Sequence, residues 1–288
     1  MTRRGVALAA SALVFNAFVW GVSWWPFREL QSLGLHPLWS TSLIYFFSLA
    51  CVTLVWPRAW HSFAQHPQLW LLAVAAGLTN VGFNWAVTIG DVVRVVLLFY
   101  LMPTWSVLLA WAVLGERPTR ASLLRLLLAM TGVLIVLKSP GSPWPVPQSA
   151  ADWLALMGGL SFAATNVLLR KLEYTPSESR MTAMFGGGAV LASGTALMGM
   201  ASQLVPAPVW SSSWAGVGLG LSLAFLLSNM ALQYGAARLA ASTTALVMLT
   251  EILFASLSAA ALGAAEFSAR TLLGGGLIVL AAALAARK

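Results

Sequence analysis

Charged residues are scarce in this chain of 288 residues, where Asp, Glu, Lys and Arg together make up only 8%. Soluble domains carry about a quarter of their residues as these four types, so a soluble surface cannot be built from this sequence. Hydrophobic residues make up 59% and the mean hydropathy is +0.84, which also excludes an intrinsically disordered chain. An integral membrane protein remains, and the length allows about ten crossings of about 20 residues each.

Cysteine and histidine are too few for several kinds of active site. The single cysteine, Cys51, lies in an apolar run, which excludes a disulfide framework and a cysteine-based metal site. His36, His61 and His66 stand at the ends of apolar runs or in loops, without metal-ligand spacing around them. A Walker loop for ATP is also missing. We therefore expect no enzyme activity, no metal and no cofactor.

Acidic residues are fewer than basic ones, and the formal net charge of +8 gives a pI near 10.6. Nucleic-acid binding needs a basic face or stripe, whereas these cations come in ones and twos between apolar runs. We expect no nucleic-acid partner and interpret the cations as signals of membrane topology.

Long apolar runs dominate the rest of the sequence, separated by Pro, Gly and charge. The start, MTRRGVALAASALVF, has the charged-then-apolar pattern of a signal peptide, but the next run follows after a short loop, so we expect an uncleaved first helix. The predicted fold class is an all-α integral membrane protein with ten transmembrane helices over residues 5–25, 37–56, 68–88, 92–114, 121–137, 152–169, 181–201, 214–234, 242–263 and 271–286.

The orientation follows from the excess of Lys and Arg in cytoplasmic loops. With the amino terminus inside, the outer side receives only Arg28, Arg94, Lys138 and Arg270 of the 16 cations. We therefore expect a multi-pass protein of the cytoplasmic (inner) membrane, in contact with the lipid bilayer, with both termini in the cytoplasm.

The two halves of the chain resemble each other. Residues 84–90 (NWAVTIG) match residues 229–235 (NMALQYG), and Leu114-Gly115-Glu116 matches Leu262-Gly263 with Glu266. Five spans are an odd number, so the second half must enter the membrane from the opposite side, as in the inverted repeats of secondary transporters. We expect a first repeat over residues 1–138, a linker over 139–151 and a second repeat over 152–288.

Several of these residues carry a resemblance to a known family. The segment FVWGVS at residues 18–23, Pro103 followed by Leu114-Gly115-Glu116, and Leu262-Gly263 with Glu266 are similar to the paired EamA repeats of the drug/metabolite transporter superfamily. The length and the 14 Trp residues make the chain most similar to exporters of the YddG type, which carry aromatic amino acids and drugs. Glu251 stands where the first half has Pro103, so the resemblance does not carry a kink over to that position of the second half.

Ionisable groups inside a membrane are costly and point to function. Glu251 lies near the middle of the ninth span, where it could exchange a proton or bind a substrate ammonium group, or it could be a neutral hydrogen-bonding group between helices. Asp91 and Arg94 are three residues apart at the outer start of the fourth span, which favours an interfacial pair. Capture of a substrate carboxylate by Arg94 is the alternative.

Uncharged candidates for a substrate cavity are amides and aromatic rings at mid-membrane depth. Asparagine in hydrocarbon needs a partner helix or a wet cavity, and rings suit flat hydrophobic substrates, although lipid-facing packing also explains them. Pro103 is the candidate hinge, because it removes a backbone hydrogen bond in mid-helix. The remaining cavity candidates are Trp20, Asn80, Asn84, Phe99, Tyr100, Trp105, Asn166 and Asn229.

The resemblance implies a secondary transporter that exports small amphipathic metabolites by alternating access, with a small-molecule substrate as partner. Protons are a candidate partner because of Glu251, and facilitated diffusion is the alternative. A carrier of other metabolites or sugar conjugates is the alternative, and it would need a basic cavity that the sequence does not reveal. An integral-membrane transferase would need paired catalytic carboxylates or histidines, and a channel would need a ring of charge.

Overall fold

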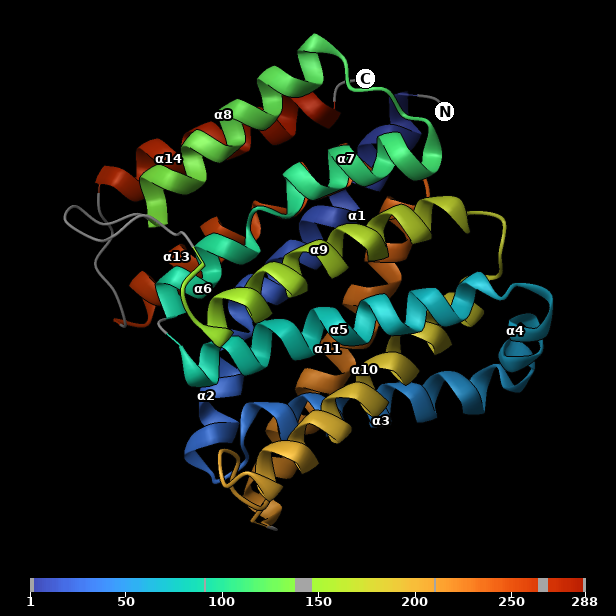
Figure 1. Ribbon diagram of the computed structural model, residues 1–288, viewed down its shortest axis with the longest axis vertical. Coiled ribbons are helices and arrows are strands. Elements are labelled where there is room, and N and C mark those ends of the chain that lie inside the picture. The colour runs from blue at the N-terminus through green and yellow to red at the C-terminus, as the bar shows by residue number, and fades with distance from the viewer. Residues whose placement is uncertain (1–2, 91, 138–146, 210, 264–268, 287–288) are drawn as a thin grey trace.

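The computed structural model describes residues 3–90, 92–137, 147–209, 211–263 and 269–286, and no strand occurs among them. The prediction of an all-α protein is therefore confirmed (Figure 1). The helices are α1 (Arg3–Val22), α2 (Trp24–Ser32), α3 (Pro37–Val55), η1 (Pro57–His61), α4 (Ser62–Gln65), α5 (Gln68–Ile89), α6 (Val92–Phe99), α7 (Met102–Leu114), α8 (Arg120–Leu137), α9 (Ala150–Lys171), α10 (Ser177–Ala201), η2 (Ser212–Trp214), α11 (Ala215–Ala236), α12 (Ala241–Met248), α13 (Glu251–Ala261) and α14 (Ala269–Ala286).

Nine helical stretches of the described chain are long and apolar enough to cross a membrane. Three of them join two α-helices each, α1 with α2, α6 with α7, and α12 with α13, and a fourth joins η2 with α11. A shorter apolar helix covers Leu272–Ala286, where the sequence predicts the tenth crossing. The apolar runs thus locate the long helices to within a few residues, because a lipid-exposed backbone must satisfy its own hydrogen bonds.

The helices form one layered bundle in which neighbours come from both halves of the chain (Figure 1). α8 packs against α14 along one side of the bundle, and α3 packs against α10 along the other. Between them, α9 packs against α5 and α7, while α1 packs against α11 and α13. The start of α1, the end of α14 and the turn from α7 to α8 lie at the same end of the bundle, here named the terminal end.

Glycines make the closest helix crossings possible. A Cβ atom on Gly132 of α8 would lie 2.6 Å from the carbonyl oxygen of Gly274, and one on Gly274 of α14 would lie 2.5 Å from that of Gly132. Gly77 of α5 meets the carbonyl of Gly187 on α10 in the same way. Small residues let helix backbones approach in membranes, where packing replaces the hydrophobic effect as the force between helices.

The spans containing Pro103 and Glu251 are both broken near their middle. In the first, the helix is interrupted at Tyr100 and Leu101, just before Pro103. In the second, it is interrupted at Leu249 and Thr250. The second half thus has a break at a position to which the resemblance carried no kink over.

The second break forms without a proline. The hydroxyl of Thr250 donates to the carbonyl oxygen of Val247 at 2.7 Å, and the backbone N–H of Ile252 donates to Leu249. A hydroxyl that bonds a nearby carbonyl competes with the helical pattern, which gives Thr250 the role that Pro103 has in the first half.

The matching Leu-Gly pairs of the two halves also occupy matching places. Gly115 follows α7 and Gly263 follows α13, and both have left-handed backbones with φ of 69° and 68°. Glycine is the residue that adopts this conformation without strain, so it ends both helices. Glu266, the acidic member of the second motif, lies outside the described residues. The likeness agrees with an inverted repeat, which remains a prediction.

Candidate substrate cavity and vestibule

A small cavity lies in the centre of the bundle and takes its walls from both halves of the chain. Its volume of about 40 Å³ has room for water. Pockets for drug-sized ligands measure roughly 300–1,000 Å³, so the cavity would have to widen to hold a ligand of that size. Helices α1, α3, α5, α9, α10 and α11 contribute its lining, which is Asn16, Trp20, Tyr45, Ala76, Thr79, Asn80, Phe162, Thr165, Met184, Phe185, Phe225, Asn229 and Leu232.

Amide groups give the central cavity its polar character. The hydroxyl of Tyr45 donates to Asn80 Oδ1 at 3.0 Å, and Asn80 Nδ2 donates to the carbonyl oxygen of Ala76 at 2.9 Å. The side-chain amides of Asn229 and Gln233 lie 2.8 Å apart. These bonds hold Asn80 and Asn229, two of the predicted cavity residues, at fixed positions on opposite halves of the chain.

Aromatic rings form much of the remaining wall. Trp20 meets Phe225 edge-on with ring centroids 4.5 Å apart, and Tyr45 meets Phe185 at 5.5 Å. None of the described lining residues carries a full charge. The cavity therefore suits an apolar or aromatic group whose polar end finds amides.

Four other predicted cavity residues lie away from this lining. Asn84 donates to Thr41 Oγ1 at 2.6 Å and so joins α5 to α3. Phe99 packs edge-on against Phe83 at 4.9 Å. Trp105 and Asn166 have side-chain atoms that are buried and find no hydrogen-bond partner in the described part of the chain.

Tyr100 and Glu251 meet where the two broken spans face each other. Tyr100 lies at the break before α7, Glu251 is the first residue of α13, and their side chains interact. Neither residue lines the central cavity as the structure describes it.

Each break is covered by a glycine of a helix from the other half. A Cβ atom on Gly159 of α9 would lie 2.5 Å from the carbonyl oxygen of Phe99, and one on Gly21 of α1 would lie 2.7 Å from that of Glu251. The predicted hinge, Pro103, is buried beside the first of these contacts.

Arg94 binds an acid from the second half of the chain. Its Nε lies 2.8 Å from Oδ1 of Asp152, whose other oxygen accepts the backbone N–H of Gln148 at 2.8 Å and that of Ser149 at 3.2 Å. Ser149 in turn accepts the N–H of Asp152, which completes a capping box at the start of α9. Asp91, the partner that the sequence predicts, lies outside the described residues. The bond to Asp152 joins α6 to α9 and supports a structural role for Arg94.

A basic vestibule of about 490 Å³ opens at the terminal end of the bundle. Its charged lining consists of Glu116 and four arginines: Arg117, Arg125, Arg170 and Arg238. The sequence does not reveal this basic cavity, because its four arginines come from separate loops and helices.

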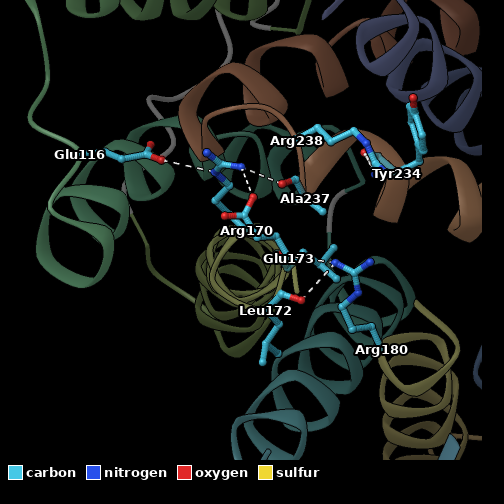
Figure 2. A network of polar contacts seen from close by, with 9 residues as sticks. Glu116, Arg170, Leu172, Glu173, Arg180, Tyr234, Ala237 and Arg238 are labelled. Carbon is cyan, nitrogen blue, oxygen red and sulfur yellow. Dashed lines mark hydrogen bonds and ion pairs between the residues drawn. The ribbon is translucent and has the colours of Figure 1, made fainter. Parts of the chain in front are cut away.

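Three residues of the vestibule lining, Glu116, Arg170 and Arg238, belong to an arginine network that also contains Glu173 and Arg180 outside the lining (Figure 2). Arg170 lies 3.9 Å from Glu116 and 2.6 Å from Glu173, and it donates to the carbonyl oxygen of Ala237 at 2.7 Å. Figure 2 shows that these contacts join the end of α9 to the segments after α7 and α11.

The other two arginines of this network have partners of their own. Arg180 donates to the carbonyl oxygen of Leu172 at 3.3 Å. The guanidinium of Arg238 lies 3.9 Å above the ring of Tyr234. Burial raises the pKa of Glu116 above its ordinary value, although Arg170 and a backbone hydrogen bond at Ala241 oppose the shift.

Comparison with known proteins shows which family the first half of the chain is similar to. The model of the EamA-like transporter family matches residues 7–138. Residues 7–138 are therefore similar to an EamA-like transporter domain. The match contains α1 to α8, and therefore the first broken span, Pro103 and the Leu114-Gly115 motif.

The curated relatives of this chain include several proteins named RarD. RarD of Escherichia coli K12 is 30% identical over 148 residues, which cover 49% of each chain. RarD of Salmonella typhi is 29% identical over the same length, and RarD of Streptomyces exfoliatus is 27% identical over 176 residues, or 57% of this chain and 52% of that protein. The matched region thus spans about half the length of these relatives.

A solved structure shows that the fold extends beyond the EamA-like domain. It matches with a TM-score of 0.74 over 96% of this chain and 96% of that chain, at 18% identity. That structure is described only as "Crystal structure of protein", words that name no activity. At this identity the likeness establishes the fold alone. The described chain has nine helices long and apolar enough to cross a membrane, and its residues 7–138 are similar to the EamA-like transporter family.

Sequence reasoning missed several residues that line the central cavity. Tyr45, Phe185 and Phe225 come from runs in which apolar and aromatic residues cover every helix face. Helical periodicity cannot separate a cavity face from a lipid face when both are apolar. The one available signal was a polar atom on the ring, as in Tyr45, which needs a buried partner.

Proposed function

We propose that this chain is a secondary transporter that exports small amphipathic metabolites, aromatic amino acids foremost, across the inner membrane. The lining of the central cavity carries the proposal, since it combines aromatic rings with fixed amides and lacks full charges. Rings would stack on a flat side chain, and the amides of Asn80 and Asn229 would bond the polar end of the substrate.

Alternating access is the mechanism that the arrangement supports. The cavity takes its lining from α1, α3 and α5 and from α9, α10 and α11, which are corresponding helices of the two proposed repeats. Rocking of residues 1–138 against 152–288 would widen the cavity toward one side at a time. The basic vestibule, placed on the cytoplasmic side by the proposed orientation, would admit the substrate.

Counterflow in proteoliposomes tests this function. Proteoliposomes that contain the purified protein would be loaded with unlabelled phenylalanine, tryptophan, threonine or a dicationic drug. Uptake of the same compound in labelled form would then be followed. We expect exchange of the aromatic amino acids, and we expect Asn80→Leu to reduce it by about tenfold or more, since a lost hydrogen bond leaves polar atoms unpaired. Asn84→Leu is the matched control, because Asn84 joins α5 to α3 outside the cavity. Absence of exchange for every compound by a folded protein would refute the proposal.

The basic vestibule favours a second candidate, a carrier of anionic metabolites such as sugar phosphates. Four arginines against one glutamate would concentrate anions at the mouth of the transport path. Adding a labelled sugar phosphate to the same counterflow series separates the two candidates. Exchange of the sugar phosphate without exchange of phenylalanine would favour the second.

A further inference from the structure

Three fully buried polar side chains have no hydrogen-bond partner among the residues that the structure describes. They are Ser106 of α7, Asn166 of α9 and Thr244 of α12, each 0% exposed. Buried hydroxyls elsewhere bond the carbonyl four residues earlier, as those of Thr165 and Thr182 do. Unpartnered polar atoms in a dry interior cost free energy, and Asn166 leaves both its amide nitrogen and its oxygen unpaired.

The three helices that carry these side chains pack against one another. Ala110 of α7, Val167 of α9 and Ala241 of α12 form one apolar cluster at their contact. Ser106 and Thr244 lie one helical turn from Ala110 and Ala241, on the same faces. Asn166 lies one helical turn from Arg170, a residue of the vestibule lining, on the same face of α9. The unpartnered groups thus lie on three helices that pack against one another, and together they are named the polar junction (Ser106, Asn166 and Thr244).

The polar junction lies between the basic vestibule and the breaks in the two broken spans. Val107 and Thr243, the chain neighbours of Ser106 and Thr244, line the vestibule. In the other direction, Glu251 stands two helical turns beyond Thr244 on the same span, and Tyr100 stands just before α7. Each of the two spans thus carries a vestibule residue, an unpartnered hydroxyl and a member of the Tyr100 and Glu251 pair.

We propose that Ser106, Asn166 and Thr244 bind water and form a hydrated passage between the basic vestibule and Glu251. Water supplies both the donors and the acceptors that the two hydroxyls and the amide require. A proton would cross as each water accepts one proton on one side and releases one on the other, so that no water is consumed. This use in coupling rests on the proposed transport function, whereas hydration of the junction does not.

Thiol labelling tests the hydration, because the chain has a single cysteine to remove. In a Cys51→Ser background, Ser106→Cys and Thr244→Cys are introduced separately, and the protein is placed in lipid nanodiscs, where both faces are accessible. A small charged thiol reagent reacts with water-exposed thiolates and spares thiols in a dry interior. Thr119→Cys, in the vestibule, is the positive control, and Ala129→Cys, buried on α8 and 0% exposed, is the dry control.

We expect both test thiols to react about tenfold or more faster than the Ala129→Cys thiol. Melting curves of each variant show whether it is folded, and the test positions lie on different helices, so one folded variant is enough. Reaction at the rate of the dry control, while the Thr119→Cys thiol reacts, would overturn the proposal. This result is independent of whether any substrate is transported.

The role in coupling has its own test. Ser106→Ala combined with Thr244→Val removes both hydroxyls, and we expect it to slow flux driven by a pH gradient several-fold while counterflow without a gradient stays unchanged. Thr131→Val is the matched control, because its hydroxyl bonds the carbonyl of Leu127 on α8. Unchanged gradient-driven flux in the double variant would show that the passage carries no protons.

Discussion

At the residue scale, Glu251 is placed where an ionisable group can take part in the proposed transport. It begins α13 at a helix break, within a span, and faces the hydroxyl of Tyr100. A carboxyl group inside a membrane is costly unless it has a partner or a function. The structure supplies a partner, so the interpretation as a hydrogen-bonding link between helices and the interpretation as a proton site both have a geometric basis.

Glu251→Gln separates these two interpretations, because glutamine keeps the shape and hydrogen-bonding capacity of the side chain but cannot ionise. If Glu251 couples transport to protons, the variant should bind and exchange substrate while the ratio of flux with a pH gradient to flux without one falls to about one. Proteoliposome flux under both conditions measures this ratio. Glu116→Gln, which removes an acid in the vestibule, should retain the gradient dependence. Preserved gradient dependence in Glu251→Gln would end the proton role.

Glu116 lies outside the spans, and its ionisation predicts that the free energy of unfolding depends on pH. Burial raises its pKa in the folded chain, so between its ordinary value of 4.5 and the raised value the folded state binds more protons than the unfolded state. The free energy of unfolding therefore falls as the pH rises through this window. The side chain is 30% exposed, which limits the fall to less than about 1 kcal/mol. Melting temperatures across the window should show the decline in the parent and less of it in Glu116→Gln, and equal slopes would contradict the prediction.

At the scale of elements, the two broken spans are held by glycines of the opposite half. Gly159 covers the carbonyl of Phe99 before Pro103, and Gly21 covers that of Glu251 beside Thr250. A carbonyl freed at a break needs close packing or a polar partner, since lipid offers neither. The contacts explain how mid-membrane breaks are tolerated.

Adding a methyl group at these glycines should therefore be costly. Gly159→Ala and Gly21→Ala would force backbones apart, and we expect each to lower the free energy of unfolding by about 1–3 kcal/mol. Gly194→Ala on α10 is the matched control, because nothing lies within 4 Å of its added Cβ, and helix propensity should make it neutral or about 0.5–1 kcal/mol more stable. Thermal unfolding in one detergent compares the three variants. Equal melting temperatures would show that the breaks can shift to accommodate a side chain.

At the scale of the whole molecule, the positions of the two ends of the chain constrain the topology. The start of α1 and the end of α14 lie at the terminal end of the bundle, as an even number of crossings requires (Figure 1). The Lys and Arg excess predicts that this end faces the cytoplasm. Reporter enzymes active only in the cytoplasm, fused to either terminus, should both be active. Activity of a reporter that works only outside, at either terminus, would exclude the ten-span orientation.

The sequence by itself determined where the long helices run and which protein class this is. Apolar runs of span length can only be helices in a bilayer, so composition and punctuation located them, and the motifs Leu114-Gly115 and Leu262-Gly263 pointed to an EamA-like family. The candidate site was predicted only in part. Trp20, Asn80 and Asn229 line the central cavity, whereas Asn84 and Phe99 serve packing, and the vestibule arginines were not recognised as one group.

Tertiary structure alone decided which side chains meet. In a soluble protein the polar face of a helix marks the solvent side, but here lipid and core are both apolar, so a helix carries no stripe that tells its neighbours apart. The bond from Arg94 to Asp152, the contact of Tyr100 with Glu251 and the break at Thr250 depend on which helices pack together. That choice is made by close crossings such as Gly132 with Gly274, between residues far apart in the chain, which no local pattern records.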